Sequence, residues 1–136
     1  AKYAPITTPA MNAVNSITGS GSLKVYKDNI SLQDRVELQF LVKSSDLSGK
    51  TVKATVGGEN ADVTYMEMEG FTIIRVAVEP AHMRDTYTIG IYDASGNPVS
   101  KIYNVSAEAY AKTKLNDAKA DAYIAMMRYG DSVAAL

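Results

Sequence analysis

Arg35-Val-Glu-Leu-Gln-Phe-Leu-Val-Lys43 is the stretch around which the chain is organised. Apolar residues occupy every second position from Val36 to Val42, and Glu37 and Gln39 stand between them. A period of two is typical of a β-strand with one buried and one solvated face. A strand of this kind needs further strands beside it, so the stretch predicts a sheet.

Five later segments have the length and composition of further strands. They are rich in β-branched and aromatic residues and are separated by Gly, Asn, Asp or Pro. The segments are residues 51–56, 61–68, 71–78, 86–93 and 99–105. Together they predict a mostly β protein with an immunoglobulin-like antiparallel sandwich. Glu69-Gly70 is expected to form a two-residue hairpin, because Gly adopts the positive φ that such a turn requires.

The chain before the sandwich has the composition of a linker or an edge segment. Residues 1–22 contain two prolines and several small polar residues, and residues 10–17 could form one helical turn or a short edge strand. We expect a strand at residues 23–26 and a turn at residues 27–29, because Asp and Asn favour turns. The sandwich is therefore expected to span residues 23–105.

The last part of the chain, residues 106–136, predicts two helices that belong to the same domain. Ser106 can cap the first helix, and residues 116–117 end it and start the second. We expect the second helix to pack on the outer face of a sheet, against residues such as Leu41 and Ile73. The apolar stripe expected to make this contact consists of Ala122, Met126, Tyr129, Gly130 and Val133.

Composition excludes several classes of function. The chain has 136 residues with 14 basic and 15 acidic side chains, so it lacks the basic excess that nucleic acids or anionic membranes attract. It contains no apolar run of about 18 residues, the length that a membrane-spanning helix needs. It has no cysteine, which excludes disulfides and thiolate metal sites. Neither nucleic acid nor membrane is expected as a partner.

Residues for catalysis or metal binding are scarce. His82 is the only histidine, and a short helical turn that begins near Pro80 explains its position without a catalytic role. The segment 93–97 lacks the spacing of a calcium loop, and turn formation accounts for its Asp and Asn. The carboxylates of Glu67 and Glu69 are expected to flank a solvated hairpin tip. We therefore expect no enzyme activity, no metal and no cofactor.

Candidate ligand-binding residues are the polar and aromatic side chains expected on solvated sheet faces. A tyrosine ring can stack on a sugar, and the chain has nine tyrosines but no tryptophan. The candidates are Tyr92, Tyr26, Arg75, Arg35 and Gln39. Their order in the sequence leaves open which of them share a sheet. The tyrosines of the last strand and helices, Tyr103, Tyr110, Tyr123 and Tyr129, are expected at the contact between helices and sheet.

Five segments of the sequence, taken in order, resemble a recurrent module. In order they are Asp28-Asn-Ile-Ser-Leu-Gln-Asp-Arg-Val-Glu-Leu-Gln-Phe40, Met83-Arg-Asp-Thr-Tyr-Thr-Ile89, Tyr92-Asp-Ala-Ser-Gly-Asn-Pro98, Val105-Ser-Ala-Glu-Ala-Tyr-Ala111 and Met126-Met-Arg-Tyr-Gly130. This order is similar to a module of large secreted, often dockerin-bearing proteins of anaerobic, fibre-degrading Gram-positive bacteria. The similarity covers roughly residues 21–136.

The resemblance implies a non-catalytic module outside the cell, beside enzymes of the cellulosome kind. It implies a polysaccharide or cell-surface glycan as ligand, and neighbouring domains of a multimodular protein as further partners. It assigns no particular residue to a ligand. A structural or protein-interaction spacer without a sugar ligand is the alternative.

Overall fold

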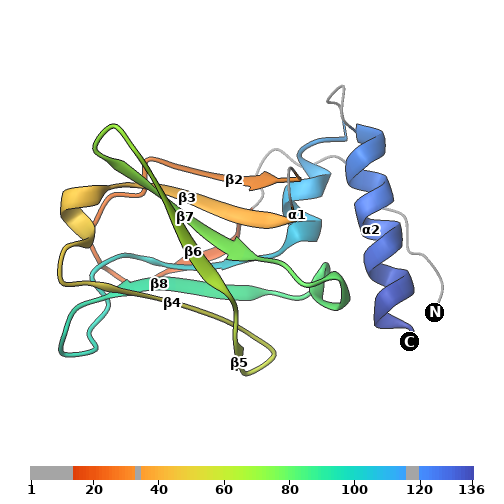
Figure 1. The fold of residues 1–136 in the computed structure, drawn as a ribbon. Coiled ribbons are helices and arrows are strands. Elements are labelled where there is room, and N and C mark those ends of the chain that lie inside the picture. Colours follow the sequence, from red (N-terminus) through yellow and green to blue (C-terminus); the bar gives the residue numbers. More distant parts are fainter. Residues whose placement is uncertain (1–13, 33–34, 116–119) are drawn as a thin grey trace.

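The computed structural model describes residues 14–32, 35–115 and 120–136, which form a β-sandwich with helices at one end (Figure 1). One sheet has the strand order β1 (Val14–Thr18), β9 (Ile102–Val105), β8 (Tyr87–Tyr92), β4 (Thr51–Val56) and β5 (Glu59–Asn60). The other has the order β2 (Lys27–Ser31), β3 (Glu37–Lys43), β7 (Phe71–Ala77) and β6 (Val63–Met68). Neighbouring strands in both sheets run antiparallel. The predicted mostly β sandwich with C-terminal helices is confirmed.

Strand β3 supplies the centre of the core, as its period of two predicts. Leu38, Phe40 and Val42 are at most 2% exposed and point toward the five-stranded sheet, which contributes Tyr87 and Ile89 of β8. The residues between them face outward. Burying such side chains stabilises the fold by roughly 1.5–3 kcal/mol each. The alternation along β3 therefore fixes which face of its sheet is dry.

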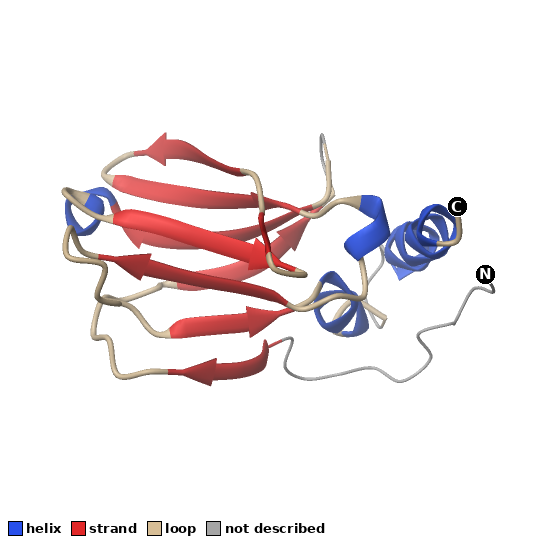
Figure 2. Cartoon of the chain, turned by 90° about the horizontal axis from the view of Figure 1, so that it is seen from below, coloured by secondary structure: helices blue, strands red, loops and turns tan. Residues whose placement is uncertain are grey.

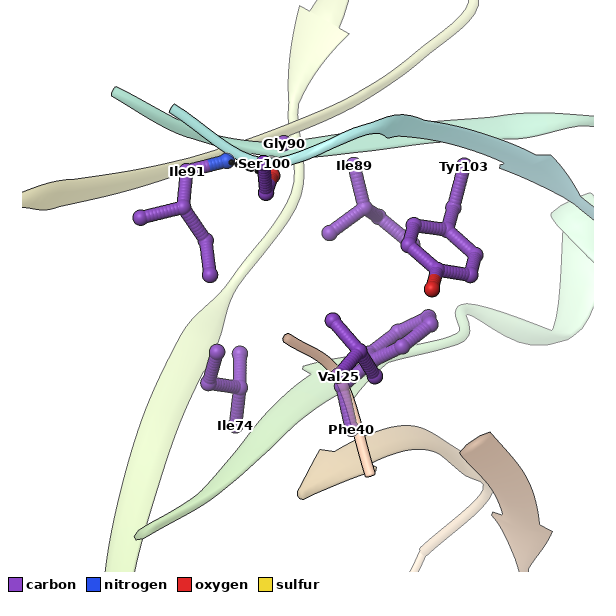
Figure 3. A pocket seen from close by; sticks show the side chains of 8 residues that line it. All are labelled: Val25, Phe40, Ile74, Ile89, Gly90, Ile91, Ser100 and Tyr103. Carbon is purple, nitrogen blue, oxygen red and sulfur yellow. Dashed lines mark hydrogen bonds between the residues drawn. The ribbon is translucent and has the colours of Figure 1, made fainter. Parts of the chain in front are cut away.

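A small void lies between the two sheets and is seen from close by in Figure 3. Its volume is about 10 Å³, which is close to the smallest space that holds one water molecule. Phe40 and Ile74 approach it from one sheet and Ile89 from the other. Ser100, which is 1% exposed, accepts a hydrogen bond from the Ile91 amide at 2.9 Å and donates one to the carbonyl oxygen of Lys101. The void is a feature of core packing and not a ligand site.

The hairpin between β6 and β7 forms at Glu69 and Gly70, as predicted. Both residues have positive φ, 50° at Glu69 and 87° at Gly70. Two consecutive positive φ values are the mark of a type I′ turn, whose twist matches that of the flanking strands. The turn fixes the register in which Met68 pairs with Phe71.

The predictions for residues 23–29 are wrong. The turn expected at residues 27–29 is part of β2, and of the strand expected at residues 23–26 only Leu23 makes a β-bridge, to Ser100. All five residues of β2 pair with β3, from Lys27 opposite Leu41 to Ser31 opposite Glu37. Pairing with the central strand outweighs the local preference of Asp and Asn for turns. In the described part of the N-terminal segment, β1 forms the edge of the five-stranded sheet, which was one of the two expected alternatives.

Two α-helices follow the last strand: α1 (Ala107–Lys112) and α2 (Ala120–Ala134). Ser106 caps α1 as predicted, because its Oγ accepts a hydrogen bond from the Ala109 amide at 3.1 Å. The boundary predicted at residues 116–117 lies outside the described residues. The 3-10 helix η2 (Pro80–His82) is the short helical turn predicted around His82. A second 3-10 helix, η1 (Ser44–Leu47), lies at the opposite end of the sandwich from α2 (Figure 1).

The helices pack on one end of the sandwich and not on the outer face of a sheet, so that prediction is wrong (Figures 1 and 2). Helix α2 lies against η2, where a Cβ added to Gly130 would come within 2.4 Å of Met83 Cγ and 2.8 Å of the Pro80 carbonyl oxygen. Arg84 then fastens both helices, since its guanidinium donates two hydrogen bonds to Asp131 and one to Glu108. Pro80, Met83 and Arg84 lie beyond the ends of the strands, and the helices pack there because they contact these residues.

The buried face of α2 also differs from the predicted stripe. Tyr123, Met126, Met127 and Gly130 are the buried residues of this helix. Tyr129, which was expected at the contact, is 61% exposed. Tyr110 of α1 is 3% exposed, and its hydroxyl donates a 2.6 Å hydrogen bond to Asp28 Oδ2 of β2. Burial raises the pKa of Tyr110 most, and the bond to Asp28 raises it further.

Candidate ligand-binding groove

The outer face of the four-stranded sheet carries the candidate site. No described helix lies over the centre of this face, because α1 and α2 sit at the end of the sandwich (Figure 2). The register of the strands determines which side chains point outward together. On β2, β3, β7 and β6 these are Lys27, Asn29, Ser31, Glu37, Gln39, Leu41, Lys43, Phe71, Ile73, Arg75, Ala77, Thr64, Met66 and Met68.

A groove crosses this face. Its shallow part has a volume of about 190 Å³ and is lined by Lys27, Asn29, Gln39, Leu41 and Ile73. An adjoining part of about 850 Å³ shares Asn29, Gln39 and Ile73 and continues to Lys114 and Tyr123, next to the helices. We call these two parts together the groove. It runs from the start of β2 to the C-terminal helices, which border it without filling it.

The floor and one side of the groove are apolar. Leu41 and Ile73 are half-buried on adjacent strands, where they form a cross-strand pair. Met66 and Met68 of the edge strand β6 are 39% and 52% exposed. Leu41 and Ile73 were the residues expected under α2; in the structure they form an uncovered surface instead.

Two amide side chains stand in the middle of the groove. Asn29 and Gln39 are directly opposite each other on β2 and β3. Gln39 donates one hydrogen bond to Glu37 Oε1 at 3.2 Å, which leaves its carbonyl oxygen as an acceptor. Within the described ranges, the side chains of Asn29 and Lys27 have no protein partner. The groove thus offers both donors and acceptors over an apolar floor.

The position of Gln39 is set by a cluster of charges around Glu37. Glu37 is only 7% exposed and lies 3.0 Å from Arg35 Nε and 3.7 Å from Arg75 Nε. Arg35 also reaches Asp62 at 3.0 Å, and hydrogen bonding to these two carboxylates raises its pKa. A buried carboxylate needs such partners, because an unpaired buried charge is costly.

Three of the five predicted site residues therefore lie together, but in different roles. Gln39 lines the groove, whereas the guanidinium groups of Arg35 and Arg75 are engaged with Glu37. Arg75 also donates to Thr64 Oγ1 at 3.1 Å. The two arginines hold the charged cluster beside the groove rather than lining its floor.

Tyr26 lies beside the same sheet, toward the end away from the helices. Its amide donates to the Leu41 carbonyl oxygen, and its ring meets that of Phe71 edge to face at 5.4 Å. Tyr26 is 37% exposed, and Lys24 Nζ and Lys43 Nζ lie 4.4 and 6.0 Å from the centroid of its ring. Tyr26 is thus a partly exposed aromatic group between two ammonium groups.

Tyr92 lies on the other sheet, apart from the other four candidates. It belongs to β8, and its ring covers Gly90: an added Cβ there would come within 3.1 Å of Tyr92 Cε1. Lys53 Nζ lies 4.7 Å from the ring centroid. The Tyr92 ring and the Ile102 side chain, whose Cδ1 would lie 2.5 Å from that Cβ, together fill the space that Gly90 leaves on the sheet. The five predicted residues do not form one site.

Asn29 and Lys27 line the groove but were not among the predicted site residues, because residues 27–29 were expected to form a turn. The sequence pattern that indicates a strand here is the alternation of inward-facing and outward-facing residues over positions 27–31. Ile30 points into the core at 2% exposure, and the polar residues on either side of it point outward. That pattern is the period of two that identified β3.

A second cavity of about 600 Å³ lies between α2 and the end of the sandwich. Its lining is mostly apolar and includes Val36, Val78, Met83 and Met126, with Tyr129 at its border. It provides fewer hydrogen-bonding side chains than the groove. The exposed position of Tyr129 places its ring at this cavity and not at the sheet.

Comparison of the chain with protein-family models, curated proteins and solved structures finds no match. None of the helices in the described ranges is long and apolar enough to cross a membrane. The described residues contain no group of three or more His, Asp or Glu side chains placed to hold a metal ion. The function of the chain is therefore inferred from its own geometry.

Proposed function

We propose that this protein is a non-catalytic, extracellular accessory module that binds a polysaccharide in the groove. The observation that carries the proposal is the amide pair Asn29 and Gln39 above the apolar floor of Leu41 and Ile73. Sugars present hydroxyl groups beside apolar C–H surfaces. A groove with amides over an aliphatic floor complements both kinds of surface.

The shape of the groove favours a chain over a single small sugar. Lys27 and Ser31 are four residues apart on β2, which corresponds to about 14 Å along the strand. The groove follows this length and continues beside the helices. A binding surface of this kind contacts several consecutive sugar units of a polysaccharide.

The environment of Glu37 supports a binding role over hydrolysis. A glycosidase uses two carboxyl groups that flank the bond to be cleaved. Glu37 is the carboxylate closest in sequence to the groove residue Gln39, and it is buried against Arg35 and Arg75. Its oxygens are occupied by these groups and by Gln39.

The experiment is titration calorimetry with β-glucans, xylans, mannans, pectins and starch. We expect heat with one polysaccharide class and a dissociation constant of about 10 μM to 1 mM, or roughly 4–7 kcal/mol. Asn29→Ala and Gln39→Ala should each abolish most of this binding. Asn97→Ala, an exposed amide in the turn after β8, is the matched control and should bind like the parent. Absence of heat with every polysaccharide, in protein with an unchanged melting temperature, would contradict the proposal.

The second candidate is a structural or protein-interaction spacer. The observation that favours it is the edge strand β6, on which Tyr65, Met66 and Met68 are 52%, 39% and 52% exposed. Edge strands with apolar side chains can pair with another chain. Tyr65→Glu separates the two candidates, because Tyr65 lies on β6 but does not line the groove: the added charge should disrupt protein pairing along β6 and leave polysaccharide binding close to that of the parent.

A further inference from the structure

The lining of the groove is positively charged, whereas the chain as a whole is nearly neutral. The sequence contains 15 acidic and 14 basic residues, and its formal charge is −1. None of the described residues that line the groove is acidic, and two of them, Lys27 and Lys114, are lysines. In the described ranges neither ammonium group has a carboxylate partner. Among the described residues, the two lysines therefore lie at opposite ends of the groove without a neutralising carboxylate.

Three carboxylates beside groove residues on the strands are turned away or already bound. Asp28 is inward-facing on β2 and accepts the hydrogen bond of the Tyr110 hydroxyl. Glu37 lies between two arginines. Glu67 is opposite the inward-facing Thr72, so it points to the other side of β6 from the two methionines. These carboxylates do little to cancel the positive potential inside the groove.

The positive charge extends along the face beyond Lys27. Lys24 and Lys43 lie beside the ring of Tyr26, and no salt bridge of the described residues includes either of them. The face thus presents lysines from the start of β2 to the end of α1. Like charges collected on one surface repel each other, and an anionic ligand relieves that repulsion.

We infer that the groove selects an acidic polysaccharide, one whose sugar units carry uronic-acid carboxylates. This inference rests on the proposed function and names its ligand class. The amides of Asn29 and Gln39 bind the hydroxyl groups of the chain, and Lys27 and Lys114 bind carboxylates near either end. Lysine suits this task because its ammonium group is a mobile point charge with three donors.

The experiment compares two forms of one polymer by titration calorimetry: polygalacturonate and its fully methyl-esterified form. The ester keeps the backbone and hydroxyl groups of the chain but removes its charge. We expect the acidic form to bind at least tenfold more tightly in about 20 mM salt. Its affinity should fall severalfold at about 300 mM salt, where charges on exposed groups are screened. A dextran sulfate of matched charge density serves as a general polyanion.

Single lysine variants test which residues cause the preference for the acidic polymer. Lys27→Gln and Lys114→Gln should each weaken polygalacturonate binding about two- to fivefold, the range for an exposed ion pair. Their binding to the methyl ester should weaken less than their binding to the acid, because the ester lacks the carboxylates that the two lysines contact. Lys101→Gln removes the same charge from an exposed position beside β9 of the other sheet and should bind like the parent.

The outcomes separate the inference from the proposed function. Equal affinity for the acid and the ester, or binding of only neutral polysaccharides, would overturn the inference and leave the proposed function standing. Equal losses in Lys101→Gln and Lys27→Gln, or tighter binding of dextran sulfate, would show general attraction of polyanions and overturn the inference as well. Binding to no polysaccharide of either kind would overturn both.

Discussion

Met127 provides the sharpest test of how α2 belongs to the fold. It is 0% exposed, whereas Tyr129, two residues later on the same helix, is 61% exposed. Met127→Ala removes three side-chain atoms of about methylene size, a loss of about 2.4 kcal/mol in transfer free energy. A residual cavity of about 50 Å³ would add about 1.2 kcal/mol. We therefore expect a loss of about 2.4 kcal/mol if the site collapses and about 3.6 kcal/mol if the cavity remains, in the free energy of unfolding.

That loss is large compared with the stability of a typical domain, about 5–15 kcal/mol. For a chain of 136 residues, an unfolding entropy of about 2.1 cal/mol/K per residue converts 3 kcal/mol into a fall of about 10 °C in Tm. Tyr129→Ala is the control on the same helix and should change the free energy of unfolding by no more than about 0.5 kcal/mol.

The assay is urea unfolding followed by both far-UV circular dichroism and tyrosine fluorescence. The two signals should give one coincident transition in the parent and in both variants, because α2 and the sandwich unfold together. A loss below about 1 kcal/mol in Met127→Ala would refute the docking of α2 through this residue. Loss of the helical signal at a lower urea concentration than the fluorescence change would show that α2 is a separate unit.

The remaining predictions concern buried hydrogen bonds. Tyr110→Phe removes the bond to Asp28 and should cost about 1.5–3 kcal/mol in urea unfolding at neutral pH, the range for a bond to a charged group. Burial raises the pKa of Tyr110 above its ordinary value near 10, so the stability of the parent should be retained below about pH 10 and fall above it. In Tyr110→Phe the fall in Tm above pH 10 should be smaller. The same fall in the parent and in the variant would contradict this role of Tyr110. Ser100→Ala leaves the buried Ile91 amide without its partner and should cost about 1–3 kcal/mol, measured against the exposed Ser95→Ala, which should be neutral.

Much of the sandwich could be predicted because its local signals agree with its tertiary structure. The alternation in β3 matched its buried face, and Gly70 marked a turn that only positive φ allows. Ser106 marked the start of α1 by its capping side chain. In each case a short stretch contained the physical cause of its own structure.

The errors arose where the cause lies elsewhere in the chain. Residues 27–29 look like a turn until β3 is placed beside them and Tyr110 supplies a partner for Asp28. The docking of α2 depends on Arg84, which lies 47 residues before its partner Asp131. Periodicity alone could not distinguish the face with Met127 from the face with Tyr129, because both contain large apolar side chains.

The candidate site was predicted in part. Gln39 was correctly expected on a solvated face, but its neighbours depend on the register between strands, which spacing along the chain does not contain. That register places Asn29 opposite Gln39 and turns Arg35 and Arg75 toward Glu37. The ring of Tyr92 is of a kind that can stack on a sugar, but its strand belongs to the other sheet.

The attachment of α2 has a mechanical consequence. The helix is held to the sandwich by its buried side chains, such as Met127, by the close contact at Gly130 and by the bonds from Arg84 to Asp131, whereas the strands are held by ladders of backbone hydrogen bonds. A pulling force applied at Leu136 therefore loads the few contacts of α2 before it loads the sheets. Unwinding its 15 residues lengthens the chain by about 2 Å per residue, from 1.5 Å in a helix to about 3.5 Å when extended. The C-terminal helix would thus yield about 30 Å of extension while the shallow part of the groove, whose lining residues all lie on strands, stays in place.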